Sequence, residues 1–573
     1  MTRWGPGMAL RYRIARAVLG GGLYALAASA HATHAPILDP VHGGTVVTVP
    51  GVGLSPPAAV NGFNPLLISS AFDQQAAGLL YQPLVWVTRR FHINKTLSIA
   101  RRITVSPGHR IFTVTLWRHW RWSDGAPVTT ADVAYTYHMI QRLGPQFANY
   151  GVGGIPTDVT SFQVLGPYRL RITLKSPVNP HWFILNGLAL LTPLPAAAWR
   201  HVSITGLYDH LADPRFFRIV DGPFRLVSFV AGRYVTFGPN HRFTGPDKPY
   251  LHRLVMRFLH NPESIFFGLK TGKIQIADLP HKLFPGRRTL RGFRERTVGP
   301  VWGFNYLGFD YANPAIAFVH DARVRVAMMH AIRQRLLIRV QYYGQGVRDY
   351  GPIPPRPPTY LSPLARRLER TGAYDPRLAR RLLRAAGWHR GADGIREKGG
   401  HRLAFTALLP PGQVRGPTLI KDMLAKVGID MRLREKPFNE IVAMTQGPDA
   451  TKWDAIYLAW GLSVYPSARN IFGCGGANNF YHYCSRRMDA LLDAVPTASG
   501  KRAIYRYEDY FIKTQPLLVL PGQRHVIEAR ADIHGLKRAY SSIGGFEPQY
   551  LWIGRRNTMT CSRQCPQTGG GRP

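Results

Sequence analysis

Cysteine and histidine are the residues of this sequence that could form disulfides or hold a metal, and their spacing limits both. The four cysteines, Cys474, Cys484, Cys561 and Cys565, all lie after residue 473. Neither pair has the C-x-x-C spacing of a zinc site or the C-x-x-C-H of a haem attachment site. Cys474 and Cys484 enclose a loop rich in glycine and asparagine, so a local disulfide between them is expected. Cys561 and Cys565 lie in a polar tail, where they either pair or are disordered.

Catalytic motifs are absent from the sequence. It contains no H-E-x-x-H helix, no P-loop and no G-x-S-x-G elbow. The 21 histidines are scattered, and His252 and His260, eight residues apart around an expected strand, are interpreted as surface histidines or histidines with satisfied hydrogen bonds, and not as metal ligands. The sequence has only 32 Asp and Glu residues, and no spacing among them indicates an acid–base pair. We therefore predict a protein that is not an enzyme and that uses no metal and no cofactor.

The N-terminus has the pattern of an export signal. Arg11, Arg13 and Arg16 precede an apolar run over residues 17–30, and A-x-A sequences end at Ala30 and Ala32. We expect cleavage near Ala32 and a periplasmic mature chain; the alternative is an uncleaved membrane anchor, for which the run is short. No later segment approaches the roughly 18 apolar residues of a membrane span.

The charge balance is strongly basic, with 73 Lys and Arg against 32 Asp and Glu and a net charge of +41. The excess is spread along the chain, and no helix-turn-helix, zinc-finger or RNA-recognition signature accompanies it. We therefore expect no nucleic-acid partner. Two explanations stay open. The protein works in an acidic periplasm, where a fold that depends on few carboxylates loses little stability when they are protonated, or the sequence has a general arginine bias.

A chain of 573 residues exceeds the size of a single core, so two lobes or three smaller units are expected. Apolar residues alternate in some segments and recur at helical spacing in others. Asp375-Pro376 opens a helix whose arginines, at 377, 380, 381 and 384, are expected to face water. The mixture in both halves predicts an α/β fold with more than one sheet. Strands are expected near 45–49, 111–116, 168–174, 224–229, 234–237, 254–258, 429–433 and 454–459, and helices near 129–141, 321–332, 375–386, 418–427 and 488–495.

Several segments together resemble one known family. The tract FTVTL at 112–116, followed by WSDGAPVT at 122–129, is similar to the signature of the family 5 extracellular solute-binding proteins of ABC importers. DGPFRL at 221–226, NYLGF at 305–309 and YDP at 374–376 follow in the family's order. The resemblance extends over residues 43–550, and the family includes dipeptide-, oligopeptide- and nickel-binding proteins.

The resemblance implies a two-lobed periplasmic-binding-protein fold of type II, in the large peptide-binding class, with an extra subdomain in the first lobe. It implies a monomer that closes on a small solute, for which a peptide is one candidate, and docks on the membrane permease. The expected divisions are a signal peptide over 1–32, a first lobe over 33–298 with its inserted subdomain near 75–205, a second lobe over 299–518, a return to the first lobe over 519–555, and a flexible tail over 556–573.

The resemblance also implies a ligand site. In peptide-binding relatives an aspartate after a Trp-containing strand end pairs with the ligand's α-ammonium, and here Trp460 keeps the aromatic wall while Ser463 stands in the aspartate's place. Serine cannot neutralise a buried ammonium, so tight binding of a free peptide N-terminus is not expected. The ligand therefore stays open between a peptide, a metal chelate, haem and another solute. The loop over 472–485 is similar to a disulfide loop of the family, which favours the Cys474–Cys484 pair. The expected ligand contacts are Tyr457, Ala459, Trp460, Gly461, Ser463, Phe63, Asn64 and Arg415.

The predicted function is the solute-binding component of an ABC importer. The alternative is a protein of the same fold that acts as a sensor or interaction protein without a transported ligand. Ser463 and the basic surface motivate this alternative.

Overall fold

The computed structural model describes residues 40–554 except 50–59, 61, 69, 148, 260, 447–451 and 541–544. The expected signal peptide with its cleavage near Ala32, the tail with Cys561 and Cys565, and His260 lie outside the described residues. No helix in the described residues is long and apolar enough to cross a membrane.

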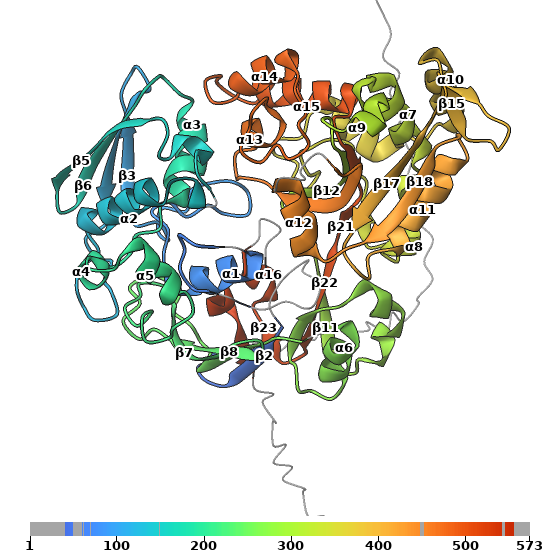
Figure 1. The fold of residues 1–573 in the computed structure, drawn as a ribbon. Coiled ribbons are helices and arrows are strands. Elements are labelled where there is room, and N and C mark those ends of the chain that lie inside the picture. Colours follow the sequence, from blue (N-terminus) through green and yellow to red (C-terminus); the bar gives the residue numbers. More distant parts are fainter. Residues whose placement is uncertain are drawn as a thin grey trace, which may run out of the picture. The chain divides into compact units, whose positions relative to one another are not determined.

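A seven-stranded mixed sheet contains strands from both ends of the sequence (Figure 1). β2 pairs in parallel with β10 and β9, and the other neighbours pair antiparallel. Alternation along β2, β8 and β9 buries Val46, Val235 and Leu254 completely on one face. The strands, in sheet order, are β11 (Phe293–Val298), β22 (His525–Arg530), β10 (Ile276–Asp278), β2 (Thr45–Thr48), β9 (Arg253–Arg257), β8 (Tyr234–Pro239) and β7 (Phe224–Val230).

A four-stranded antiparallel sheet and the helix α2 (Thr130–Leu143) occupy the region of the expected subdomain. The helix expected near 129–141 begins with a capping box: the backbone N–H of Thr129 donates to Asp132 Oδ2 at 2.8 Å and the Thr129 side chain accepts from the helix. Asp132 is buried, and burial raises the pKa of its carboxyl group. The strands, in sheet order, are β3 (Ala100–Val105), β4 (Ile111–Leu116), β6 (Arg169–Leu174) and β5 (Val159–Gly166).

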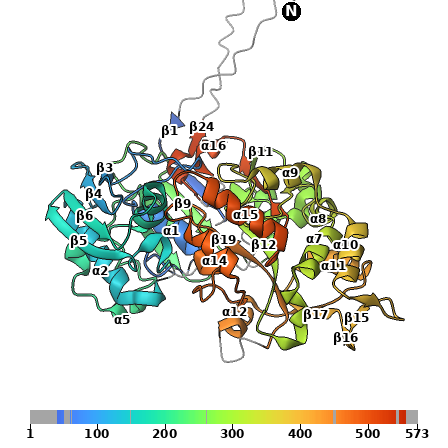
Figure 2. The same ribbon diagram turned by 90° about the horizontal axis from the view of Figure 1, so that it is seen from above.

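A five-stranded sheet is the third large sheet; α7 (Ala322–Ala331) contacts β20, α11 (Arg415–Ala425) packs on β18, and α10 (Pro376–Ala385) packs on α7 (Figures 1 and 2). Asp375 caps α10 by accepting from two backbone N–H groups, and the four α10 arginines face water as predicted. The strands, in sheet order, are β18 (Asp430–Glu435), β17 (Ala404–Leu409), β19 (Ala455–Gly461), β12 (Gly303–Phe309) and β20 (Leu518–Leu520).

The chain passes between the seven-stranded and five-stranded sheets twice. Residues 299–302 connect β11 to β12, and residues 521–524 lead from β20 to β22. The second connection contains β21 (Gly522–Gln523), which pairs with β13 (Gly346–Val347). The α/β class is confirmed, whereas the lobe and subdomain boundaries stay predictions.

The remaining elements include strands of two or three residues and the other α-helices. Short strands form two three-stranded sheets: β1 (Pro40–Val41), β24 (Trp552–Gly554) and β23 (Ile533–His534), and β14 (His389–Arg390), β15 (Arg396–Lys398) and β16 (His401–Arg402). The other helices are α1 (Ala71–Leu80), α3 (Pro180–Trp182), α4 (Ala196–Trp199), α5 (Ile204–Asp209), α6 (Pro262–Lys270), α8 (Gln334–Gln341), α9 (Pro363–Thr371), α12 (Phe438–Gln446), α13 (Arg469–Phe472), α14 (Arg486–Asp493), α15 (Arg502–Thr514) and α16 (Leu536–Ala539).

Candidate functional site

The strand β19 carries four of the expected ligand contacts and emerges from the core at its carboxyl end. It pairs with β12 so that Trp460 lies opposite Phe304 and Ala459 opposite Asn305. Tyr457 is buried, Trp460 is half-buried, and Ala459 and Gly461 are exposed. The carboxyl end of the strand, with Trp460, is therefore accessible to a ligand, whereas Tyr457 in the middle of the strand is not.

Ser463 lies in a hydrogen-bonded turn just beyond β19. The Trp302 indole N–H donates to the Ser463 carbonyl at 2.9 Å, and the backbone N–H of Leu462 donates to the Trp302 carbonyl at 3.0 Å. The Ser463 hydroxyl donates to the carbonyl of Tyr465 at 3.0 Å. This hydroxyl therefore holds the turn together, and its oxygen keeps acceptor capacity for a ligand.

An asparagine from the expected subdomain binds the backbone of the same turn. Asn186, which is 1% exposed, accepts from the N–H of Tyr465 at 2.9 Å and donates to its carbonyl at 2.7 Å. Trp182 donates from its indole to Ser467 Oγ at 3.1 Å. The Asn186 side chain thus bonds both backbone groups of Tyr465, as a neighbouring strand would, across 279 residues of sequence.

A second asparagine of this segment adds to the same contact. The Asn179 side chain donates to the Tyr465 hydroxyl at 3.1 Å and to the Ala498 carbonyl at 2.7 Å. The Tyr465 hydroxyl in turn donates to the Gly500 carbonyl at 3.2 Å. Both ends of Tyr465 are therefore held by the segment over 179–186, which we call the asparagine clamp.

Four buried aromatic rings lie next to the clamp. Phe91 packs against Trp302 and Tyr360 with ring centroids 4.6 and 5.3 Å apart, and Tyr360 packs against Tyr465 at 5.3 Å. Phe91 has a positive φ of 62°, which is uncommon for a bulky residue. The rings connect the segment before β3, the residue just before β12 and the segment before α9 with the turn beyond β19.

The other expected contacts lie away from this turn. Phe63 is fully buried and packs edge-on against Phe217 and Phe229, and Asn64 accepts from the backbone N–H of Leu66 at 3.0 Å. These contacts place both residues in the core beside the seven-stranded sheet. Their role as ligand contacts stays a prediction.

Arg415 opens α11, where its guanidinium donates to the Tyr343 hydroxyl at 2.7 Å and lies over that ring. The neighbouring helix α8 supplies Gln341, whose side chain donates to the Tyr457 hydroxyl at 3.1 Å. The start of α11 and the buried end of β19 are therefore neighbours through α8. Arg415 as a ligand contact also stays a prediction.

The predicted disulfide is confirmed, because Cys474 and Cys484 are bonded. Inside the loop that they close, His482 lies 2.8 Å from the fully buried carboxylate of Asp310. Burial raises the pKa of Asp310, and His482 opposes that shift. In the part of the chain that the structure describes, no group of three or more His, Cys, Asp or Glu side chains could hold a metal ion.

Sequence reasoning missed the clamp and the four rings. Asn179 followed by Pro180 is a helix-start pattern, and Asn179 does cap α3 by accepting from His181 N–H. That signal could locate the helix but not its contact with Tyr465. Nothing local in the sequence marks Asn186 or Phe91.

The backbone of Trp460 lies very close to Gly303 of β12, so there is no room for a side chain at position 303. A Cβ on Gly303 would lie 2.1 Å from the Trp460 carbonyl oxygen, whereas a Cβ on the opposite residue, Gly461, would meet nothing within 4 Å. Gly303→Ala is therefore expected to separate the two strand ends and lower the free energy of unfolding by about 1–3 kcal/mol. Urea denaturation measures this loss, and Trp fluorescence reports the displaced indole. Gly461→Ala is the matched control, and an equal loss in both variants would contradict the steric explanation.

Comparison with known proteins supplies a family for this arrangement. A model described as "Bacterial extracellular solute-binding proteins, family 5 Middle" matches residues 96–479. The oligopeptide-binding protein AppA of Bacillus subtilis is 23% identical over 461 residues, which cover 79% of this chain and 81% of AppA.

Two solved structures have the same fold. The structure of Bacillus subtilis AppA in complex with a nonapeptide has a TM-score of 0.73 at 20% identity and covers 90% of this chain and all of AppA. The structure of NikA from Brucella suis in complex with Fe(III)-EDTA has a TM-score of 0.75 at 21% identity and covers 89% of this chain and all of NikA.

Proposed function

Because the chain belongs to the bacterial extracellular solute-binding proteins of family 5, we propose that it captures a peptide-like solute at the Trp460 end of β19 and delivers it to the permease of an ABC importer. The observation that carries this proposal is the turn beyond β19, where Trp460 stands half-buried beside backbone held by Trp302 and Asn186. Binding sites of this kind combine an aromatic wall with a few fixed polar groups. The named relative AppA supports a peptide.

A second ligand class is favoured by the contacts of Ser463. In the described chain, the hydrogen bonds of residues 460–467 go to amide, indole, hydroxyl and carbonyl groups, and none goes to a carboxylate. A free α-ammonium would need such a partner on burial. A solute without a free ammonium, such as an N-blocked peptide or an anionic metal chelate, suits this turn better, and NikA holds a chelate on the same fold.

Thermal unfolding with candidate solutes tests the proposal. We expect a solute at 100 times its Kd to stabilise the protein by about 2.7 kcal/mol. The probes are a free nonapeptide, the same nonapeptide N-acetylated, nickel–histidine and Fe(III)-EDTA. A larger shift with the acetylated peptide or a chelate than with the free peptide supports the second ligand class.

Trp460→Ala locates the site in the same measurement. This variant should lose the shift while keeping the ligand-free unfolding temperature within a few degrees, because Trp460 is half-buried. If no probe shifts the wild-type protein, or if Trp460→Ala keeps the full shift, the proposed site is wrong. The sensor alternative gains no support from the named relatives.

We also propose that the protein is monomeric and periplasmic after cleavage near Ala32. The arginines and the short apolar run before Ala32 support this cut. Mass spectrometry of the exported protein is expected to give a mature chain that starts at Thr33. A chain that keeps residues 17–30 would contradict cleavage and favour the membrane anchor.

A further inference from the structure

The outer face of the seven-stranded sheet carries arginines without partners. Arg233, Arg253 and Arg257 are all exposed. No hydrogen bond or ion pair in the described residues engages their guanidinium groups. Some surface arginines elsewhere in the protein, such as Arg323 and Arg530, pair with nearby carboxylates, whereas these three leave their charge available to a partner.

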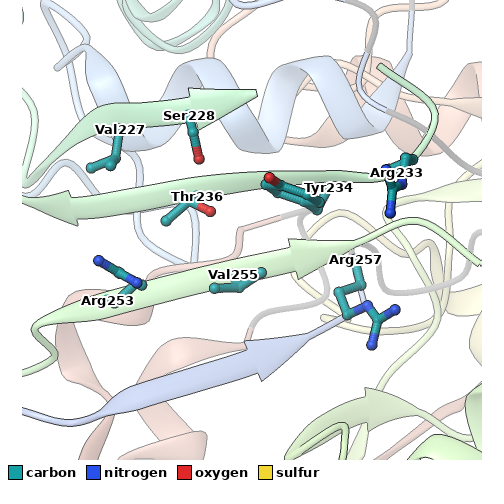
Figure 3. Close-up of a pocket in the computed structure, with 8 residues that line it drawn as sticks. All are labelled: Val227, Ser228, Arg233, Tyr234, Thr236, Arg253, Val255 and Arg257. Atoms are coloured by element: carbon teal, nitrogen blue, oxygen red, sulfur yellow. The ribbon is translucent and has the colours of Figure 1, made fainter. Parts of the chain in front are cut away.

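The three arginines line a shallow hollow of about 470 Å³ over β7, β8 and β9. Figure 3 shows Arg253 and Arg257 at opposite ends of β9, with Val255 between them and Arg233 near Arg257. Four residues of extended strand span roughly 13 Å. That is the span between the two Cα atoms, and Figure 3 shows the two side chains apart at the two ends of the strand, so the hollow suits a ligand with two spaced anionic groups.

A second hollow of about 450 Å³ adjoins the first at Arg257, which lines both. It runs along α6, where Phe267 is 61% exposed and Lys273 adds another cation. Its carboxylate, Glu263, is paired with Lys282 at 2.6 Å. The first hollow also has an exposed apolar side chain, Val227, which is 42% exposed. The two adjoining hollows, which share Arg257, combine basic and apolar side chains, and we call them together the β9 groove.

We propose that the β9 groove docks an extended acidic segment of a partner protein, with carboxylates four residues apart and apolar residues near them. Charge complementarity argues for this occupant, since the groove offers cations without partners at strand spacing. In an extended segment, residues i and i+4 lie on the same side and about 13 Å apart, which matches Arg253 and Arg257. The exposed Val227 and Phe267 favour a polypeptide over an acidic polysaccharide. The inference concerns a surface away from Trp460, so it goes beyond the proposed solute binding.

The test compares two labelled nine-residue peptides of the same composition by fluorescence anisotropy. One has glutamates at positions 3 and 7, and the other has them adjacent; serine, threonine and one phenylalanine fill both. We expect the spaced peptide to bind the purified protein at least fivefold more tightly than the clustered one. Arg233→Gln, Arg253→Gln and Arg257→Gln together should weaken the spaced peptide at least tenfold.

A matched variant controls for the large net charge. Arg377→Gln, Arg380→Gln and Arg381→Gln remove the same charge from the exposed face of α10 and should change binding less than twofold. Equal losses in both triple variants would show attraction by net charge only and overturn the proposal, as would equal binding of both peptides. If vesicles of phosphatidylcholine and phosphatidylglycerol bind through Arg233, Arg253 and Arg257 while the spaced peptide does not bind, the occupant is a membrane and the proposal fails. The triple variant of Arg233, Arg253 and Arg257 should keep the thermal shifts that solutes cause in the wild-type protein. This outcome would show that peptide docking in the β9 groove and solute binding at Trp460 are independent.

Discussion

The protein is expected to be more stable at pH 5 than at pH 8, and Glu508 on α15 is expected to cause much of the difference. This side chain is fully buried, and its Oε2 accepts from the backbone N–H of Ser362 at 2.6 Å. Burial raises the pKa of Glu508 to about 8, with a further increase from Asp509 and opposition from Ser362 and Arg366. Asp349 is buried nearby, and its pKa is raised by burial and by Glu508.

The free energy of unfolding should fall as the pH rises, because Glu508 keeps its proton in the folded protein and loses it in the unfolded chain. In the unfolded chain Glu508 releases its proton near its ordinary pKa, whereas the folded protein keeps it protonated up to about pH 8. The stabilisation is therefore complete below the ordinary pKa and is lost as the pH rises towards 8, at about 1.4 kcal/mol per pH unit. Between pH 5 and pH 8 we expect a loss of roughly 2–4 kcal/mol from this group.

Glu508→Gln isolates the contribution, because the amide keeps the acceptor for Ser362 but cannot ionise. Urea denaturation should find the variant close to wild type at pH 5 and more stable than wild type at pH 8. Glu263→Gln is the control: Glu263 is exposed, and the hydrogen bond from Lys282 lowers its pKa, so its effect should not vary between pH 5 and pH 8. A difference between wild type and Glu508→Gln that is constant over this range would contradict the assignment.

Asn186→Ala is expected to weaken solute binding at least tenfold. The substitution leaves the buried N–H and carbonyl of Tyr465 without the partners that Asn186 provides. Each such group costs about 1–3 kcal/mol when it is not paired. Since Tyr465 lies two residues beyond Ser463, the cost is borne by the turn that we propose holds the solute. Isothermal titration with whichever probe stabilises the wild-type protein measures the effect.

Asn240→Ala provides the matched control. Asn240 is also buried and also bonds two backbone groups, the carbonyl of Gly222 and the N–H of Arg242, but both belong to the region of the seven-stranded sheet. Asn240→Ala should lower the unfolding temperature about as much as Asn186→Ala does, but it should leave the Kd of the solute unchanged. Equal weakening of binding in the two variants would show that general destabilisation, and not the clamp, is responsible.

Local signals in the sequence located much of this structure. Thr129 with Asp132, and Asp375 with Pro376, place the starts of α2 and α10 because capping depends on neighbours within a single turn. The ten-residue separation of Cys474 and Cys484 marked the disulfide in the same way. The family resemblance, and not periodicity, directed attention to Trp460 and Ser463.

Contacts between distant segments had no such signal. Asn186 reaches Tyr465 across 279 residues, and an asparagine in an apolar segment gives no indication of which backbone it will bind. Phe63 illustrates the opposite difficulty: an aromatic residue beside a glycine suits a binding loop or a core equally, and only the packing of Phe217 and Phe229 around it shows that it is buried. The basic excess was visible in the sequence, but the pairing of β8 with β9 that brings Arg233 next to Arg257 was not.

The two passages of the chain between the seven-stranded and five-stranded sheets, at 299–302 and 521–524, limit how these sheets can move. A body tethered at one point can swivel about three axes. A second tether leaves rotation about the line joining the two points as the motion that stretches neither. Sliding and twisting would strain the backbone at one tether or the other. A substitution that stiffens either passage should therefore slow this single motion and leave each sheet's own stability unchanged.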